Sequence, residues 1–150
     1  MTARWIAIAS KPHKEEALYR KLQADGYEIF FPRYRQDMGG ARVTKPYFPG
    51  YLFVKVDLNL VGVSTFQWMP FAIGPVDICG KPAHIPDRLI IAIQKRVNQL
   101  NRAANSAADS FCLNNIGDIQ EYKAILDASS SAEERIIALL EVIQQETVPN

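Results

Sequence analysis

The chain has 150 residues, of which 48% are apolar, enough for one domain with a sizeable core or for a domain of about 100 residues with an appendage. No apolar run approaches the roughly 18 residues that a membrane span needs, and no signal-peptide pattern opens the sequence, so we expect a cytoplasmic protein without a membrane partner. The two cysteines, Cys79 and Cys112, have neither metal-ligand spacing nor disulfide density and are expected to be ordinary core residues.

The net charge of +1 conceals an uneven distribution. Residues 1–105 hold 15 Lys and Arg against 8 Asp and Glu, a net +7, whereas residues 106–150 hold 2 against 8, a net −6. This pattern is typical of a basic body for an anionic partner with an acidic appendage, and two solvated surfaces of unequal composition would give it equally well. In either case the two parts should attract each other.

The first predicted elements are a buried strand and an amphipathic helix. The apolar run 5–10 indicates the strand. Pro12 suits a first helical turn, and Asp25-Gly26 ends the helical pattern. The apolar residues at helical spacing are Ala17, Leu18 and Leu22.

Aromatic residues and glycines then predict a hairpin. Residues 27–34 are rich in aromatic residues and Ile and predict a second strand. The turn sequence 38–41 predicts a hairpin between this strand and one that begins near Tyr47 and continues over 51–56.

A short helix, a strand and a longer helix are predicted next. Residues 58–68 lack the turn signal that another strand would need, so we expect a short helix that ends at Met69-Pro70. A strand follows around 76–79, and the longer helix begins at 85–87. Its apolar face carries Leu89, Ile90, Ile93 and Val97.

The last third predicts a linker and two helices. Residues 101–112, rich in Asn, Ala and Ser, predict the linker, and helices are expected at about 117–128 and 131–146. Ser131, followed three positions later by Glu134, is typical of a capping box at a helix start. The apolar stripe of the last helix comprises Ile136, Ile137, Leu140 and Ile143.

An enzyme is not predicted. His13 and His84 are the only histidines, and neither has a Cys, His or acidic neighbour at ligand spacing. The sequence has no phosphate-binding glycine loop, nucleophile elbow or carboxylate pair of the kind that catalysis uses. We therefore expect no catalytic residue, no metal and no cofactor.

Basic residues cluster in and just before the first helix. They are Lys11, Lys14, Arg20 and Lys21. Lys14 and Lys21 lie a heptad apart on one helix face, with Lys11 a turn earlier. Such a face suits DNA or RNA phosphates without reading their sequence, and a solvated face next to the glutamates at 15–16 is the alternative.

The stretch KPYFPGYLFVKVD, residues 45–57, concentrates aromatic side chains around one Pro-Gly pair. Tyr47, Phe48 and Tyr51 cannot all lie on one side of an extended chain, so core packing alone does not account for them. Aromatic side chains beside an apolar helix are typical of a protein-docking surface, because they bury a large area with little loss of entropy.

The order of these features resembles the N-terminal domain of NusG-like transcription elongation factors over about residues 4–100. The similarity lies in Trp5, the first helix, Phe31-Pro32, YFPGYLFV at 47–54 and WMPFAIGPVDICGKPAHIP at 68–86. It implies an α/β fold in which a four-stranded antiparallel sheet is flanked by helices.

The resemblance also implies a non-catalytic protein that binds bacterial RNA polymerase. In this family an apolar face docks on the clamp helices of the largest subunit, and the domain reaches the gate loop opposite, which favours elongation over pausing. The matching clamp-binding residues are Tyr47, Phe48, Pro49, Tyr51, Ile90 and Ile93, and gate-loop contact falls at Ser64 and Thr65. The positions of Lys11 and Lys21 approach the non-template DNA strand, although the tip at 69–71 lacks the basic residue often found there.

The tail departs further from the family pattern. NusG-like proteins usually end in a KOW domain, a five-stranded barrel with a glycine-rich segment, and only traces of it occur here, at 117–118 and 134–141. Its Ala, Glu, Leu and Gln content favours helix. RfaH-type members have a C-terminal helical hairpin that covers the clamp-binding face until recruitment, so we expect residues 113–150 to form such a hairpin. The expected masking side chains are Ile136, Leu140 and Ile143.

Three functions are compatible with the sequence. The first is a specialised NusG paralog that suppresses pausing or termination on selected operons. The second is a nucleic-acid-binding module that uses the Lys11–Lys21 face without polymerase, and the third is a degenerate paralog that competes with the housekeeping factor. A self-covered docking face favours a monomer.

Overall fold

β1 (Arg4–Ser10) is an inner strand of an antiparallel sheet in the computed structural model, which describes residues 3–78, 80–103, 123–126 and 131–147. The strand order is β2 (Glu28–Phe30), β5 (Tyr51–Val56), β1 and β6 (Ala72–Pro75), and short β9 (His84–Ile85) also pairs with β1. The β1–β5 register runs from the Arg4–Val56 pair to the Ala9–Tyr51 pair. The predicted four-stranded antiparallel sheet is confirmed, with β9 as an addition.

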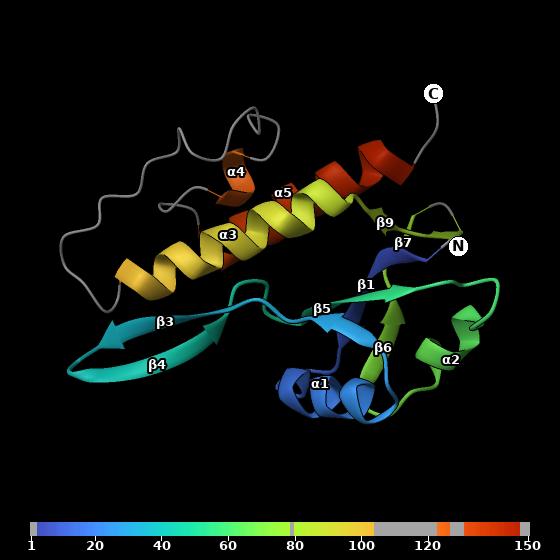
Figure 1. Cartoon of the computed structure of the whole chain (residues 1–150), viewed down its shortest axis with the longest axis horizontal. Coiled ribbons are helices and arrows are strands. Elements are labelled where there is room, and N and C mark those ends of the chain that lie inside the picture. Colours follow the sequence, from blue (N-terminus) through green and yellow to red (C-terminus); the bar gives the residue numbers. More distant parts are fainter. Residues whose placement is uncertain (1–2, 79, 104–122, 127–130, 148–150) are drawn as a thin grey trace.

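Helices cover both faces of this sheet (Figure 1). On one side lie α1 (Glu15–Ala24) and α2 (Val63–Gln67), and on the other lie α3 (Asp87–Ala103), α4 (Lys123–Leu126) and α5 (Ala132–Thr147). Side chains of β1 alternate between the two layers, so that Ile6 and Ile8 pack with α1, whereas Trp5 and Ala7 pack with the helices of the opposite layer. The predicted α/β fold with flanking helices is therefore confirmed.

A long hairpin extends from the sheet beside α3 (Figure 1). β3 (Arg33–Met38) and β4 (Ala41–Pro46) pair antiparallel and are joined by Gly39 and Gly40, which have φ angles of 58° and 86°. A two-residue turn with positive φ at both positions matches the right-handed twist of the paired strands. The hairpin contacts α3, where the backbone N–H of Arg35 donates to Asn101 Oδ1 at 2.9 Å.

We expect Gly40→Val to destabilise the fold by about 2 kcal/mol, because a β-branched side chain is strained at a φ of 86°. Gly40→Asn is the matched control, since Asn tolerates this conformation far better. Urea denaturation of the two variants measures the difference. Equal free energies of unfolding of Gly40→Val and Gly40→Asn would show that a β-branched side chain at position 40 does not strain the turn.

The Pro-Gly pair of the aromatic stretch forms a tight turn before β5. Tyr51 N–H donates to the carbonyl oxygen of Phe48 at 3.1 Å, and Gly50 has a φ of 87°. A type II turn requires positive φ at its third position, which favours Gly, and Pro is common at its second position. The expected strand start near Tyr47 is therefore wrong, because residues 47–50 are turn and bend, and the strand begins at Tyr51.

The predicted strand at 27–34 is divided in two. It breaks at Phe31-Pro32, which separates β2 in the central sheet from β3 in the hairpin. Pro32 has no N–H to donate to a strand ladder, and its carbonyl oxygen instead accepts from Tyr47 N–H at 2.9 Å. Of the strand expected around 76–79, only Asp77–Ile78 is a strand: this is β7, which pairs with β8 (Lys81–Pro82), and residue 79 lies outside the described residues.

The helices agree with their sequence patterns except at the start of α1, which begins at Glu15, so that Pro12 lies before the helix and not in its first turn. α2 occupies only the later part of the segment 58–68 where a short helix was expected, and all four residues of the predicted α3 face are buried. α3 continues to Ala103, so residues 101–103 of the predicted linker are helical, and 104–112 lie outside the described residues. The helix expected at 117–128 is described only at 123–126, where it is helical.

Candidate protein-docking face

The residues predicted to bind the polymerase clamp lie together on the α3 side of the sheet. We call Tyr47, Phe48, Pro49, Tyr51, Ile90 and Ile93 the docking face. Tyr47, Phe48, Ile90 and Ile93 belong to one buried cluster, against which Tyr51 packs half-buried, while Pro49 is exposed. The Pro-Gly turn makes this possible, because it reverses the chain between the two tyrosines.

Aromatic rings connect the docking face to the sheet. The Tyr47 and Phe48 rings are perpendicular with centroids 5.0 Å apart, and Phe48 meets Phe53 of β5 edge to face at 5.8 Å. Tyr34 of β3 lies 6.1 Å from Tyr47, also edge to face. These are favourable aromatic geometries, so the docking face has a rigid base.

The C-terminal helices cover this face. Ile125 and Leu126 of α4 and Leu139 and Ile143 of α5 are at most 1% exposed and join the same buried cluster as Tyr47 and Phe48. Ser131 caps the start of α5 as predicted, because Glu134 N–H donates to its Oγ at 3.2 Å and the hydroxyl donates back to Glu134 Oε1 at 3.3 Å.

The inner face of α5 differs from the apolar stripe expected from the sequence. Of the expected masking residues, Ile143 is fully buried, whereas Ile136 and Leu140 are half-buried. The most buried positions are instead Arg135, Ala138, Leu139 and Ile143, which recur every three to four residues. The helix is thus rotated relative to the prediction, because the side chain of Arg135 turns inward.

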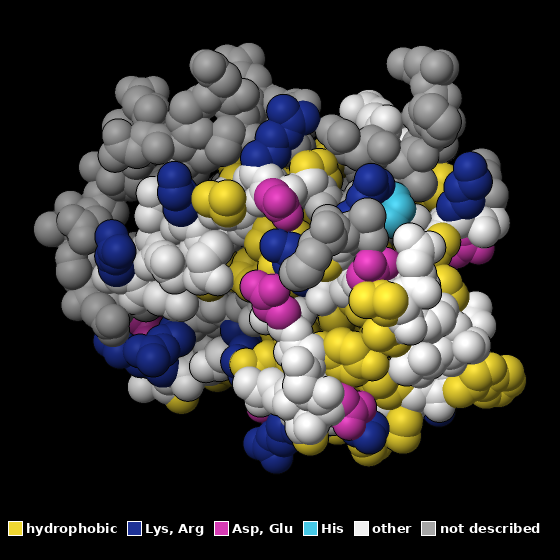
Figure 2. Space-filling view, turned by 45° about the vertical axis from the view of Figure 1, so that its right-hand side comes forward, with side chains coloured by type: hydrophobic (Ala, Val, Ile, Leu, Met, Phe, Trp, Pro, Cys, Tyr) yellow, Lys and Arg dark blue, Asp and Glu magenta, His cyan; other side chains and the backbone are white. Residues whose placement is uncertain are grey.

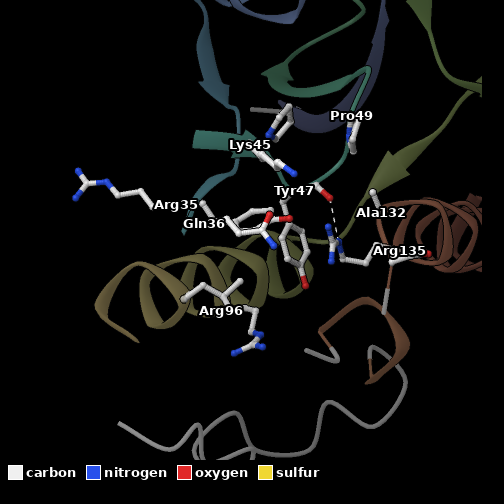
Figure 3. A pocket seen from close by; sticks show the side chains of 12 residues that line it. Arg35, Gln36, Lys45, Tyr47, Pro49, Arg96, Ala132 and Arg135 are labelled. Carbon is white, nitrogen blue, oxygen red and sulfur yellow. Dashed lines mark hydrogen bonds between the residues drawn. The ribbon is translucent and has the colours of Figure 1, made fainter. Parts of the chain in front are cut away.

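Arg135 makes the main polar contact between α5 and the docking face (Figure 3). Its Nε–H donates to the backbone oxygen of Tyr47 at 3.1 Å, and its guanidinium lies 4.3 Å from the centroid of the Tyr47 ring. The Tyr34 ring centroid is 5.6 Å from the same guanidinium. Arg135 is only 6% exposed, so the hydrogen bond and the cation–π contacts are shielded from water.

The Tyr47 side chain makes a second polar link to the tail. Its hydroxyl donates a hydrogen bond to the backbone oxygen of Ile125 in α4. Burial raises the pKa of Tyr47 above its usual value, although the nearby guanidiniums of Arg135 and Arg96 act to lower it. The hydroxyl therefore stays protonated at neutral pH and remains a donor.

The predicted gate-loop and DNA-binding residues lie on the α1 and α2 side of the sheet, opposite the docking face. Ser64 and Thr65 are exposed on α2, and Lys11 and Lys14 are exposed before α1. Lys11 N–H donates to the carbonyl oxygen of Phe71 at 2.8 Å, which holds the basic segment beside the loop after α2. The other two basic residues make ion pairs within α1 or at its end, Arg20 with Glu16 and Lys21 with Asp25.

Exposed apolar side chains near α2 were not anticipated from the sequence. Leu60, Trp68 and Ile73 are 84%, 85% and 63% exposed. Phe71 in the same region has a φ of 72°, a conformation that non-glycine residues rarely adopt. Figure 2 shows hydrophobic side chains gathered on the face that this view presents, with Lys and Arg mostly at its edge.

We expect acidification to destabilise the fold partly through His84 of β9. Burial, followed by the positive charge of Arg4, lowers the pKa of His84, so the folded state favours the neutral ring. This contribution to stability is present above the unfolded pKa of about 6.5 and is lost as the pH falls through the lowered folded value. Denaturation at neutral pH and at about pH 5 should show a smaller loss of stability in His84→Gln than in the wild type.

If His84→Gln instead shows the same loss between these pH values, other groups account for the pH dependence.

None of the helices that the structure describes is long and apolar enough to cross a membrane. Within the same residues, no group of three or more His, Cys, Asp or Glu is arranged to hold a metal ion.

Comparison with known proteins identifies the family. The family model described as transcription termination factor NusG matches residues 3–94, more than half of the chain. Among solved structures, one obtained in a study of domain interaction in Thermotoga maritima NusG is similar, with a TM-score of 0.49 and 23% identity. The match covers 63% of this chain and 57% of that chain, so this chain spans little more than half of the Thermotoga protein's chain. No curated protein matches. On the evidence of the family match, the chain belongs to the NusG family.

Proposed function

We propose that this protein is a specialised, RfaH-type NusG paralog that binds bacterial RNA polymerase and suppresses pausing or termination on selected operons. In this proposal the body ends with α3 at Ala103, and residues 113–150 are a degenerate KOW region that masks the docking face. Membership of the NusG family supports the transcriptional role. The observation that carries the masking role is the burial of Tyr47, Phe48 and Leu139 in a single cluster.

The proposed mechanism is a competition between α5 and the polymerase clamp for one surface. The docking face is apolar and aromatic, and such a surface is costly to leave in water. When α5 covers it, the clamp helices have no access to Phe48 and Ile93. Recruitment then requires α5 to leave, and the net −6 charge of residues 106–150 against a net +7 body opposes this departure.

When the protein is docked on the clamp, the α1 and α2 side of its body is proposed to face the gate loop and the DNA. Ser64 and Thr65 are exposed on α2 and available for the gate-loop contact. Lys11 and Lys14 are exposed and, with Arg20 and Lys21, are proposed to contact the non-template strand. The masked form is proposed to be a monomeric, non-catalytic cytoplasmic protein.

A transcription assay on a template with a defined pause site tests this function. We expect the wild type to shorten the pause weakly, and Leu139→Asp, in which a charge displaces α5, to shorten it strongly. Adding Tyr51→Ala to Leu139→Asp should abolish the effect, because Tyr51 is proposed to contact the clamp. Adding Ser64→Ala and Thr65→Ala instead should leave polymerase binding intact and reduce only the effect on pausing. Equal pausing with and without Leu139→Asp protein would refute the proposed role in elongation.

A nucleic-acid-binding module that acts without polymerase is the second candidate. It is favoured by Lys11 and Lys14, which are exposed and take part in none of the ion pairs found among the described residues. Binding of naked DNA at physiological salt, with an affinity that falls steeply as salt rises, would support it. Loss of that binding in Lys11→Gln and Lys14→Gln variants would place it on this face.

A further inference from the structure

The loop between α2 and β6, residues 68–71, presents an aromatic surface to water. Trp68 is 85% exposed, whereas Trp5, the other tryptophan of the chain, is 8% exposed in the core. Phe71 at the end of the loop is 37% exposed. Because the indole of Trp68 is almost fully exposed, core packing does not account for it.

This loop is joined to the basic segment before α1. Lys11 N–H donates to the carbonyl oxygen of Phe71, so residues 11–14 and the loop lie side by side on the α1 and α2 side of the sheet (Figure 1). His13 and Phe71 have φ angles of 60° and 72°, and they are the non-glycine residues with positive φ in the described part of the chain. Strained backbone of this kind clusters at ligand-binding sites. Its occurrence on both of the joined segments indicates a binding site between them.

The charge around Trp68 is positive. Lys11 and Lys14 are exposed, and residues 58–76 contain no charged side chain. Glu16, an exposed carboxylate on nearby α1, pairs with Arg33 at 3.0 Å. A flat aromatic ring beside lysines, without a carboxylate on the loop to repel phosphate, is the arrangement with which proteins bind single-stranded nucleic acids.

An unpaired strand fits this surface better than a duplex does. In a duplex the bases are stacked on one another, so their flat faces are out of reach, and only phosphates and groove edges contact a protein. In a single strand a base can leave its neighbours and stack on an aromatic ring, while the phosphates on either side reach basic side chains.

We propose that Trp68 is a stacking platform for an unpaired base of single-stranded DNA or RNA, and that Lys11 and Lys14 bind the phosphates next to that base. This site extends the DNA contact of the proposed function from phosphates to a base. It rests on the proposed function only for which strand it meets in the cell.

Quenching of tryptophan fluorescence tests the stacking, because Trp68 is the exposed one of two tryptophans. The full chain is titrated at constant salt with oligodeoxythymidine and oligouridine of about 15 nucleotides and with a dT·dA duplex of the same length. We expect saturable quenching by at least one single strand, and the tighter of the two identifies DNA or RNA as the ligand. Absence of quenching by both single strands up to about 1 mM, or equal quenching by the duplex, overturns the proposal.

Variants at position 68 separate stacking from a general apolar contact. Trp68→Leu keeps an apolar side chain without an aromatic face, and Trp68→Phe keeps a ring. Measured by anisotropy of a labelled oligonucleotide, affinity for the single strand should fall at least about fivefold in Trp68→Leu and clearly less in Trp68→Phe. Leu60→Ala is the matched control, because Leu60 is 84% exposed near α2 but aliphatic, and it should bind like the wild type.

Equal affinity of Trp68→Leu and the wild type overturns the proposal, and so does a loss in Trp68→Phe or Leu60→Ala as large as in Trp68→Leu. All substituted side chains are largely exposed, so the variants should fold like the wild type. No polymerase is present in these experiments. Their failure would therefore leave the proposed docking on the clamp standing, and failure of the pause assay would leave this site standing.

Discussion

Leu139→Asp should release α5 from the docking face. Leu139 is fully buried against α4 and the body, so the substitution removes its apolar contacts and leaves a carboxylate in an apolar cluster. We expect the covered arrangement to lose about 4 kcal/mol, equivalent to roughly a thousandfold shift toward the open form. Hydrogen exchange followed by mass spectrometry measures this as faster exchange of the α5 amides.

The matched control for this prediction is Ile137→Asp on the same helix. Ile137 is 58% exposed, so the same charge there should leave exchange in α5 nearly unchanged. Protection of β1 and β5 should persist in both variants, because their cores include the cluster on the α1 side, which α5 does not touch. Identical protection of α5 in Leu139→Asp and the wild type would contradict the packing described above.

Arg135→Ala should destabilise the covered arrangement of the tail by about 2 to 3 kcal/mol. The substitution removes the Nε bond to the Tyr47 carbonyl and both cation–π contacts, and it leaves that buried carbonyl without this donor. Arg135→Lys should lose less, because it keeps the charge near the rings. Exchange of α5 amides and urea denaturation measure the loss, and Glu141→Ala, an exposed position on the same helix, is the control.

Tyr47→Phe separates the two polar links between tail and body. It keeps the ring that Arg135 covers and removes only the hydroxyl bond to Ile125, so we expect a cost of about 1 kcal/mol.

If Arg135→Ala lowers stability no more than Glu141→Ala does, the contacts of the Arg135 side chain do not hold α5 on the body.

Much of the body could be predicted because its signals are local. The apolar run of β1, the helical spacing in α1 and α3, and the Gly-Gly turn are set by neighbouring residues. The division of residues 27–34 was missed because the aromatic pattern continues across Phe31-Pro32, although a proline within a strand pattern is itself a signal of a break.

The site was predictable only in part. The aromatic stretch and the apolar face of α3 indicated the docking face, and helical content in the tail indicated its cover. The inward rotation of Arg135 was not predicted, because its partners, the Tyr47 carbonyl and the Tyr34 ring, are about 90 or more positions away in the sequence. The one available signal was its spacing of four residues from Leu139, which places both on one helix face.

The central claim is that α5 covers a polymerase-binding surface. Its most direct test is the affinity of the full chain for purified bacterial core RNA polymerase, measured for the wild type, Leu139→Asp and Ile137→Asp. We predict that Leu139→Asp binds at least tenfold more tightly than the wild type and that Ile137→Asp binds like the wild type. Equal affinity of all three proteins would contradict masking by α5, and no binding by any of them would contradict the polymerase as partner.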